Sequence, residues 1–197
     1  YGKLEILDTN GITGPHKGSV PIDLFKFSSS DYTYAGSKTK KLVSDLFKDI
    51  DKKNFSDIEL LNLLSKNILL KVKYLKGKTS IKTTAEESLG LGFGVCQDHV
   101  HIFLASTRLM GYPSRYVSGY LMLNNTNIQD ASHAWAEVFV ENLGWVGFDI
   151  SNSISPDDKY VKLAIGFDYI DVIPISGIRV GESDEKIKTN ILIESKQ

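Results

Sequence analysis

The stretch that decides the fold comprises residues 92–110 and reads Gly-Phe-Gly-Val-Cys-Gln-Asp-His-Val-His-Ile-Phe-Leu-Ala-Ser-Thr-Arg-Leu-Met. It holds the only cysteine of the 197-residue chain, Cys96, directly after a turn that contains two glycines. Apolar residues follow Cys96 at helical spacing, and Gly111 with Pro113 is a typical helix stop. The pattern therefore predicts a helix whose first turn contains Cys96.

A cysteine in the first turn of a helix has two interpretations. Free cysteine is most often a small buried apolar residue. A helix N-terminus, however, leaves backbone N–H groups unpaired and favours an anion, and cysteines placed there are typically the reactive ones. The position of Cys96 leaves both interpretations open, so the choice depends on the rest of the chain.

Length and charge bound the class of protein. A chain of 197 residues can bury about 70 % of its unfolded surface as one domain. The 23 basic and 24 acidic residues give a net charge of −1 without a basic run, so no nucleic-acid partner is expected. No apolar run is long enough for a bilayer, and no secretory signal precedes the core. A soluble, cytoplasmic protein without a membrane partner is the expectation.

The first part of the chain predicts an arm followed by helices. Residues 1–36 contain a short strand candidate, 3–7, and then irregular sequence rich in Gly, Pro, Ser and Thr, so we interpret them as an N-terminal arm or connector. The core is expected to span residues 37–197. Its first helices are predicted over residues 37–50, 56–71 and 84–90. The last two begin with capping-box pairs, Ser56 with Glu59 and Thr84 with Glu87.

Strands dominate the chain after Pro113. They are predicted over residues 114–123, 132–140, 144–150, 162–165, 170–173 and 186–193, with a polar loop at 124–130. Helices that precede a run of strands indicate an α+β fold with an antiparallel sheet.

A thiolate nucleophile needs a base, and the base needs an orienting group. The histidines are His16, His99, His101 and His133. His16 lies in the irregular arm, and His99 and His101 lie on the helix of Cys96 itself, where they cannot easily meet the thiol. His133 begins a predicted strand that can cross in front of the helix start, so it is the candidate base.

Asp149 is the candidate orienting group because of the predicted hairpin. With Val140 opposite Gly144, Asp149 lies opposite Trp135 and diagonal to His133, about 7 Å away between backbones. Carboxylate and imidazole can span that separation. A register shifted by one residue would place the two side chains on opposite faces of the sheet and rule out their contact.

Further residues are expected to line this site. The backbone N–H of Cys96 is one donor for an oxyanion, and Tyr74 is the candidate for the second, with Gln97 as its rival. Trp135 and Trp145 are expected to flank His133 and Asp149 as a dry aromatic wall, although plain sheet core explains them as well.

A metal site is not expected. Cys96, His99 and His101 lack the paired spacing of zinc ligands, and the two histidines face different sides of a helix. No cofactor is expected either. Asp98, in the first helical turn, is interpreted as a residue for helix stability and packing.

Four blocks of the sequence resemble the transglutaminase-like superfamily, in particular the core domain of its bacterial cysteine-protease members. They read Gly94-Val-Cys96-Gln-Asp-His99, Arg108-Leu-Met-Gly-Tyr-Pro-Ser-Arg115-Tyr-Val-Ser-Gly119, His133-Ala-Trp135-Ala-Glu137 and Gly144-Trp-Val-Gly-Phe-Asp149. Residues 161–177 also resemble the segment that follows the catalytic residues in those proteins. His99 departs from the family, which more often has an aromatic or small residue there.

The resemblance implies a papain-like α+β fold with Cys96 as nucleophile, His133 as base and acid, and Asp149 as orienting group. It also implies an additional β-rich domain before the core in most members. The leading hypothesis is a thiol hydrolase that acts on peptide or amide bonds of a peptide or protein substrate through a thioester. The alternatives are a protein-glutamine acyltransferase with the same triad and a non-catalytic protein-binding module with a vestigial triad.

Overall fold

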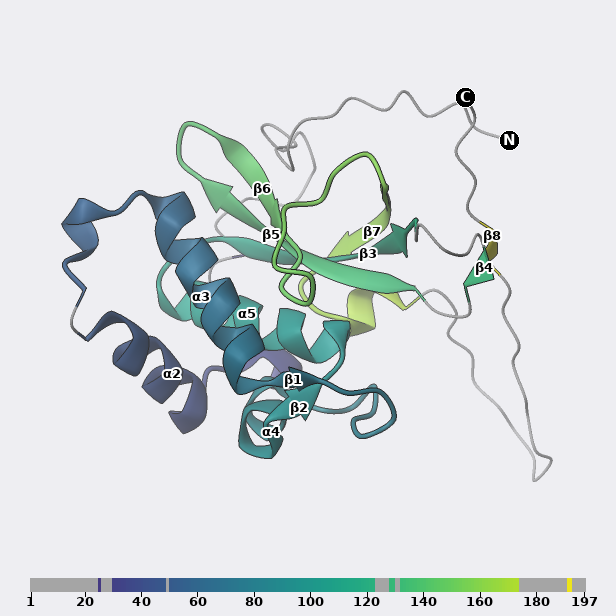
Figure 1. Cartoon of the computed structure of the whole chain (residues 1–197), viewed down its shortest axis with the longest axis horizontal. Coiled ribbons are helices and arrows are strands. Elements are labelled where there is room, and N and C mark those ends of the chain that lie inside the picture. Colours follow the sequence, from purple (N-terminus) through teal and green to yellow (C-terminus); the bar gives the residue numbers. More distant parts are fainter. Residues whose placement is uncertain are drawn as a thin grey trace.

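The computed structural model describes Phe25 and residues 30–48, 50–122, 128–129, 132–173 and 191–192. Its helical elements are η1 (Asp31–Thr33), α2 (Ser37–Phe47), η2 (Lys52–Asn54), α3 (Asp57–Lys71), α4 (Ala85–Leu91), α5 (Cys96–Leu109) and η3 (Ile170–Val172). Its strands are β1 (Lys73–Tyr74), β2 (Phe93–Gly94), β3 (Ser114–Leu121), β4 (Ile128–Gln129), β5 (His133–Val140), β6 (Gly144–Phe148), β7 (Tyr160–Gly166) and β8 (Ile191–Leu192). In Figure 1 the helices gather on one side and the main sheet on the other. This is the α+β fold with an antiparallel sheet that the sequence predicts.

Capping residues fix the starts of α3 and α4. Ser56 Oγ accepts a hydrogen bond from the Glu59 N–H at 3.3 Å, and the Glu59 carboxylate accepts from the Ser56 N–H at 2.8 Å. Thr84 and Glu87 repeat the arrangement at the start of α4. Both predicted capping boxes are confirmed. Helix α2 ends at Phe47, three residues earlier than predicted.

Helix α5 is the centre of the molecule. It begins at Cys96, as predicted, and ten consecutive residues, 98–107, are buried. Burial on every side marks a core helix rather than a surface helix. It packs against α2, α3 and α4 on one side and against β5 and β3 on the other. The stretch 92–110 therefore connects the helical layer to the sheet.

The main sheet has the strand order β6-β5-β3-β7, and each neighbouring pair is antiparallel. In the hairpin of β5 and β6, Val140 lies opposite Gly144, which confirms the predicted register. One face, the helix face, carries core residues that pack with α5, namely Ala134, Ala136, Val138, Val140, Tyr116, Val146 and Phe148. His133, Trp135, Glu137 and Phe139 alternate with them and belong to the opposite face.

A β-bulge interrupts the pairing of β3 with β7. Ser118 lies opposite Ala164, but the next residue, Gly119, lies opposite Lys162, so Leu163 is an extra residue in β7. Because side chains alternate, one extra residue reverses the faces of all residues beyond it. The bulge therefore turns Lys162 and Tyr160 to the face that also carries His133 and Glu137.

Gly119 is required at this bulge by close packing. A Cβ atom there would lie 2.1 Å from the Val161 carbonyl oxygen and 2.7 Å from the Trp135 ring. No side chain fits in that space, so the glycine allows Trp135 to lie across β3.

One strand prediction and one loop prediction need correction. Residues 170–173 were predicted as a strand, but Ile170–Val172 form a 3-10 helix. Here the Asp168 carboxylate accepts a hydrogen bond from the Ile170 N–H, and Asp171 accepts from the Phe167 N–H, so acidic side chains fold the chain into a turn. The predicted loop 124–130 contains strand β4, which pairs with β8.

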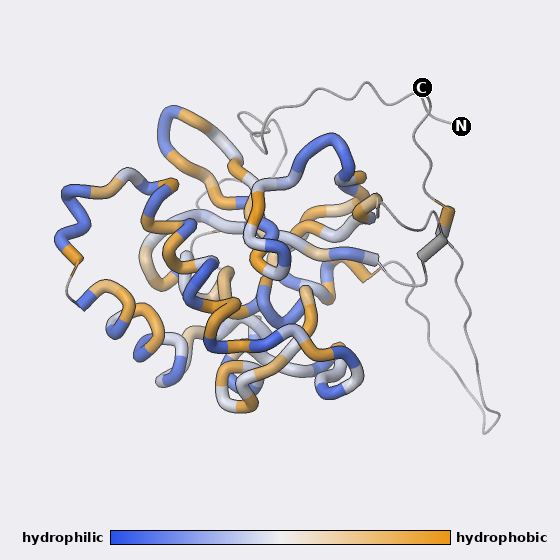
Figure 2. The backbone as a smooth tube through the Cα atoms, viewed as in Figure 1, coloured by the Kyte–Doolittle hydropathy of each residue, from blue (hydrophilic) through white to orange (hydrophobic). Residues whose placement is uncertain are grey.

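Several predictions fall on residues outside the described part: the strand candidate 3–7, residues 1–24 and 26–29 of the arm, and residues 186–190 and 193 of the last predicted strand. Within the described part, no helix has the length and apolar character needed to cross a membrane. Figure 2 shows hydrophilic residues interrupting the hydrophobic ones along α3, the longest helix.

Candidate active site

Cys96 is held at the start of α5 by strand β2, which precedes it in the chain, and by strand β1, which pairs with β2. β1 and β2 pair in parallel, and the Leu75 N–H donates to the Gly94 carbonyl at 2.8 Å. The Asp98 carboxylate then accepts hydrogen bonds from the Val95 N–H and the Thr79 hydroxyl, both at 2.7 Å. Asp98 thereby caps the helix, which agrees with its predicted role in helix stability.

Gly94 makes room for that cap. A Cβ at this position would lie 2.6 Å from the Asp98 Cβ and 2.9 Å from the Ser88 hydroxyl, so any larger residue would displace the carboxylate. Cys96 itself is a free, half-buried cysteine. As the first helical residue it has a backbone N–H without an acceptor four residues earlier in the helix, which leaves this donor available to a ligand.

His133 and Asp149 meet at the end of the β5–β6 hairpin. His133 Nε2 lies 2.6 Å from Asp149 Oδ2, and the Asp149 side chain is fully buried whereas that of His133 is 14 % exposed. Cys96 lies close enough to His133 to raise the pKa of the imidazole. Since Nε2 is bound to Asp149, Nδ1 is the ring nitrogen that faces the sulfur.

Electrostatics keep His133 protonated at neutral pH. Burial lowers the pKa of this imidazole, but hydrogen bonds and charge interactions with Asp149 and Cys96 outweigh burial and raise the pKa to about 9. For Asp149, burial acts to raise the pKa, and hydrogen bonds and the charge of His133 bring it below its ordinary value. The pair therefore exists as imidazolium and carboxylate at pH 7.

Two further side chains donate to Asp149, and neither was predicted. The Tyr160 hydroxyl and the Asn152 amide each donate to Asp149 Oδ2 at 2.7 Å, and the Asn152 N–H donates to Oδ1 at 3.2 Å. An Asn three residues after an Asp, in a short turn, is a local signal that could have indicated Asn152. Tyr160 faces the site because of the bulge in β7, and no local sequence signal predicts that bulge.

The two tryptophans have different locations. Trp135 stacks on His133, with ring centroids 6.4 Å apart, and meets the Tyr160 ring edge-on at 5.4 Å. Trp145 is paired with Phe139, about 20 Å along the strand from His133, and its ring lies under the Arg115 guanidinium. The expectation that Trp145 flanks the site is therefore corrected: it belongs to the other end of the sheet.

The two candidates for the second oxyanion donor also differ in position. Tyr74 lies in β1 beside the site: burial raises its pKa, and the charges of Cys96 and Asp149 raise it further. The Gln97 side chain donates to the Ile81 carbonyl at 3.1 Å, so it holds the loop before α4. Of the two side chains, that of Tyr74 is the one that the charges of Cys96 and Asp149 reach.

His99 and His101 are internal residues of α5. His99 is fully buried, with Nε2 2.8 Å from the Val72 carbonyl and Nδ1 2.8 Å from the Ser151 hydroxyl. His99 thus ties α5 to the turn that follows Asp149, two residues beyond it. His101 lies between the rings of Tyr32 and Tyr116.

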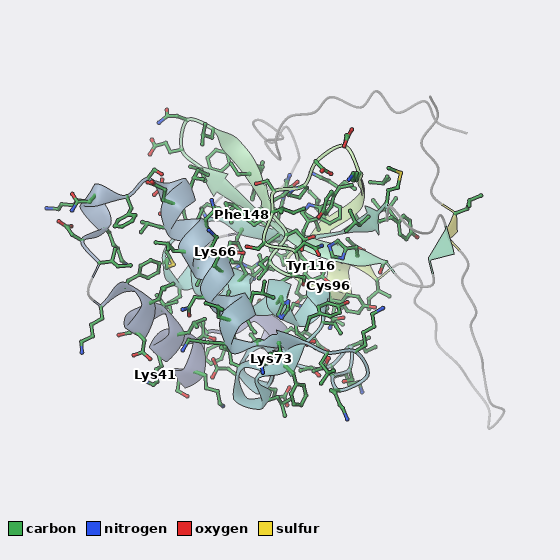
Figure 3. All side chains as sticks on the ribbon, viewed as in Figure 1. Lys41, Lys66, Lys73, Cys96, Tyr116 and Phe148 are labelled. Atoms are coloured by element: carbon green, nitrogen blue, oxygen red, sulfur yellow. The ribbon has the colours of Figure 1, made fainter. Side chains whose placement is uncertain are left out.

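Tyr116, labelled with Cys96 in Figure 3, is a buried residue on the helix face of β3. Burial raises the pKa of Tyr116 well above its ordinary value, with the charge of Cys96 as the next contribution. Among the residues that the structure describes, no three His, Cys, Asp or Glu side chains are arranged to hold a metal ion.

A cysteine at a helix start, next to a strand-borne histidine on an antiparallel sheet, defines the papain-like class of folds found in thiol enzymes. Comparison with known proteins specifies the group further. The family model of the transglutaminase-like superfamily matches residues 44–150, and the chain belongs to that superfamily.

Relatives and a solved structure agree with this assignment. An uncharacterized protein of Mycobacterium leprae is 35% identical over 116 residues, which cover 56% of this chain and 41% of the relative. An uncharacterized protein of Mycobacterium tuberculosis is 34% identical over 140 residues, which cover 66% of this chain and 45% of the relative. The chain therefore spans less than half the length of these relatives.

The crystal structure of a "putative cysteine protease" from Cytophaga hutchinsonii superposes with a TM-score of 0.70 at 26% sequence identity. The superposition covers 89% of this chain and 57% of that protein. Family and structural neighbour together place the chain among proteins of a thiol-enzyme family.

Proposed function

We propose that the chain is a thiol hydrolase that cleaves peptide or amide bonds of a peptide or protein substrate, with Cys96 as nucleophile, His133 as acid and base, and Asp149 as orienting group. The observation that carries the proposal is the position of His133. One ring nitrogen is bound to a buried carboxylate, and the other faces the only thiol of the chain. This is the arrangement that activates a nucleophile in covalent catalysis.

In the first step, Cys96 attacks the substrate carbonyl carbon as a thiolate, because its proton is held by His133. The carbonyl oxygen becomes an oxyanion that the backbone N–H of Cys96 binds, and the Tyr74 hydroxyl is our candidate for a second donor. Gln97 is the weaker candidate because its amide already binds the Ile81 carbonyl. Protonated His133 then transfers its Nδ1 proton to the leaving amine, and a thioester on Cys96 results.

In the second step, water attacks the thioester. Neutral His133 accepts a proton from the water at Nδ1, the carbon–sulfur bond breaks, and the carboxylic acid product leaves. Throughout the cycle Asp149 keeps the imidazole oriented and stabilises its charged form, because its buried carboxylate binds Nε2. In this scheme residues 37–197 form the catalytic core and residues 1–36 a connector.

An acyltransferase is the second candidate, since the transglutaminase-like family assignment favours it. Both reactions use the same thioester, and the acceptor that reaches it decides the product. A binding module with a vestigial triad is the third. Its weakness is that thiol, imidazole and carboxylate are all present and in contact.

Alkylation of Cys96 separates a catalytic thiol from an inert one. Because Cys96 is the only cysteine, the labelled site is unambiguous, and intact mass gives the stoichiometry. We expect iodoacetamide to modify the protein at pH 6 at least tenfold faster than it modifies a free cysteine peptide. The Cys96→Ser variant controls for modification elsewhere. A rate equal to that of the peptide would favour the binding module.

Hydrolase and transferase are then distinguished by product. The protein is incubated with glutamine-containing peptides and a labelled primary amine, and mass spectrometry scores cleaved peptide, released ammonia and amine incorporation. Cleavage or deamidation supports the hydrolase. Amine incorporation in excess of both contradicts it and establishes the transferase.

A further inference from the structure

Tyr160 makes a hydrogen bond that the proposed chemistry does not require. It is the first residue of β7, and its hydroxyl donates to Asp149 Oδ2 at 2.7 Å. The same oxygen accepts from His133 Nε2 at 2.6 Å. The Asn152 amide donates to this oxygen as well. Three donors therefore share one carboxylate oxygen, and two of them, His133 and Tyr160, differ in proton affinity.

The Tyr160 ring is also fixed in place. It packs edge-on against Trp135 at 5.4 Å and lies 5.9 Å from the His133 ring. The bulge at Leu163 turns Tyr160 toward this face, since the uninterrupted register would place Val161 there instead. Backbone register, ring packing and hydrogen bond all direct the hydroxyl to Asp149.

We propose that Tyr160 is a positioning residue of the triad: its hydroxyl fixes the Asp149 carboxylate and limits the negative charge that this carboxylate presents to His133. The inference rests on the proposed function and extends it to the control of proton transfer. Tyr160 does not touch the reacting atoms. It acts through Asp149.

The physical reason is competition for one acceptor. A hydroxyl that donates to a carboxylate oxygen withdraws part of its charge, so less remains for a second donor at the same oxygen. Burial and the hydrogen bond to Asp149 raise the pKa of Tyr160, so the hydroxyl stays protonated across the pH range in which His133 titrates. Tyr160 is therefore a constant donor, unlike His133.

Other titratable groups act on this cluster and must stay unchanged in a test. They are Cys96 and His99 from α5, Tyr74 from β1, and Asp157 from the turn before β7. The substitution Tyr160→Phe removes one hydroxyl and leaves all of these groups and the ring packing in place.

In Tyr160→Phe, Asp149 offers more charge to His133, so the pKa of His133 rises above its value of about 9 in the unmodified protein. The alkaline limb of the rate profile moves to higher pH by at least ~0.3 unit. At neutral pH kcat falls about tenfold, because the less constrained carboxylate orients the imidazole poorly, and KM changes less than twofold.

The chain offers a matched control. Tyr112 donates its hydroxyl to Asp57 Oδ1 at 2.5 Å, and its neighbour Pro113 accepts a hydrogen bond from the Phe139 N–H, at the end of β5 away from His133. Tyr112→Phe removes the same type of hydrogen bond, and we expect it to leave the pH profile and kcat unchanged. A merely structural role for Tyr160 would make the two variants alike.

NMR titration of the His133 imidazole provides a readout that needs no substrate, with His133→Gln to assign the resonance. An upward shift in Tyr160→Phe, absent from Tyr112→Phe, supports the inference even if no turnover is found, in which case only the hydrolase proposal fails. An unchanged titration with an unchanged kcat in an active enzyme overturns the inference and leaves the hydrolase proposal intact.

Discussion

Two buried carboxylates on the same face of the sheet have very different partners. Glu137 binds Arg115 at 2.6 Å and also binds Lys162, and the Arg115 guanidinium lies 3.9 Å above the Trp145 ring. Asp149 binds a histidine, a tyrosine hydroxyl and an asparagine amide. The first cluster connects β7 to β5, and the second connects β7 to β5 and to the residue that follows β6.

The difference lies in what the partners can release. Arginine and lysine side chains carry hydrogen-bond donors and no acceptor, so the cluster at Glu137 is an ion network held by charge-assisted hydrogen bonds. Histidine changes its charge near physiological pH, so the cluster at Asp149 can move a proton. The same sheet face thus combines an ion network with a titrating cluster, and each reaches solvent through one cationic side chain, Lys162 in the first and His133 in the second.

The largest expected effects are losses of activity at the Asp149 cluster. We expect His133→Ala to reduce kcat/KM by about 10³ to 10⁴, because the nucleophile loses its base and acid together. Asp149→Ala should retain at least about tenfold more activity than His133→Ala, since the carboxylate orients and does not transfer the proton. Steady-state kinetics on a fluorogenic peptide measure both variants.

Thermal unfolding of the two variants provides the control, because a loss of activity counts only if the fold is retained. An active His133→Ala variant would end the proposed mechanism.

At the other cluster the expected loss is in stability. Glu137→Gln keeps the volume but removes the charge that the two cations share, and breaking a buried ion network of this kind costs about 3–5 kcal/mol. Urea unfolding measures it. Activity per folded molecule should be unchanged, which separates this cluster from that of Asp149.

The matched control is the exposed ion pair between Lys41 and Asp45 on α2. Asp45→Asn should leave the unfolding midpoint unchanged, because an exposed pair is screened by water and salt. If Glu137→Gln behaved like this control, the network at Glu137 would not stabilise the fold.

The smallest predicted effect concerns stability at alkaline pH. Because His133 has a raised pKa in the folded state, its contribution is fully present below about pH 6.5 and is lost as the pH rises through about 9. The loss is about 3 kcal/mol as an order of magnitude. Urea unfolding at pH 6 and pH 9.5 should detect it in the unmodified protein.

His133→Gln should remove most of that alkaline loss. The variant Glu137→Gln should keep it, since it leaves the contact between His133 and Asp149 in place. An equal loss of unfolding free energy in the unmodified protein, His133→Gln and Glu137→Gln would mean that neither cluster controls the pH dependence.

Local signals account for what the sequence predicted well. The starts of α3, α4 and α5 follow from capping residues and apolar spacing. For each helix these signals lie within a few residues of the start. The hairpin register follows from a turn of three residues between Val140 and Gly144. Because that register decides the faces of His133 and Asp149, their contact could be predicted as well.

Non-local features account for the errors. Alternation correctly placed Trp145 on the face of His133, but a shared face says nothing about distance along the strand. Tyr160 was missed because its face depends on a bulge that arises from the pairing of β7 with β3. Residues 170–173 have the apolar character of a strand, yet hydrogen bonds from Asp168 and Asp171 give a 3-10 helix.

The bulge in β7 has a consequence for how this protein can evolve. Leu163 is 54% exposed, so its identity is nearly free, and it has no partner on β3, because Ala164 pairs with Ser118 and Lys162 with Gly119. Loss of that single codon would remove the bulge but keep Lys162 opposite Gly119 and Tyr160 opposite Leu121, so the Tyr160 hydroxyl and the Lys162 ammonium would stay on the face of Asp149 and Glu137. The bulge therefore marks a place in β7 where a chain one residue shorter would still bring Tyr160 and Lys162 to the face of His133 and Glu137.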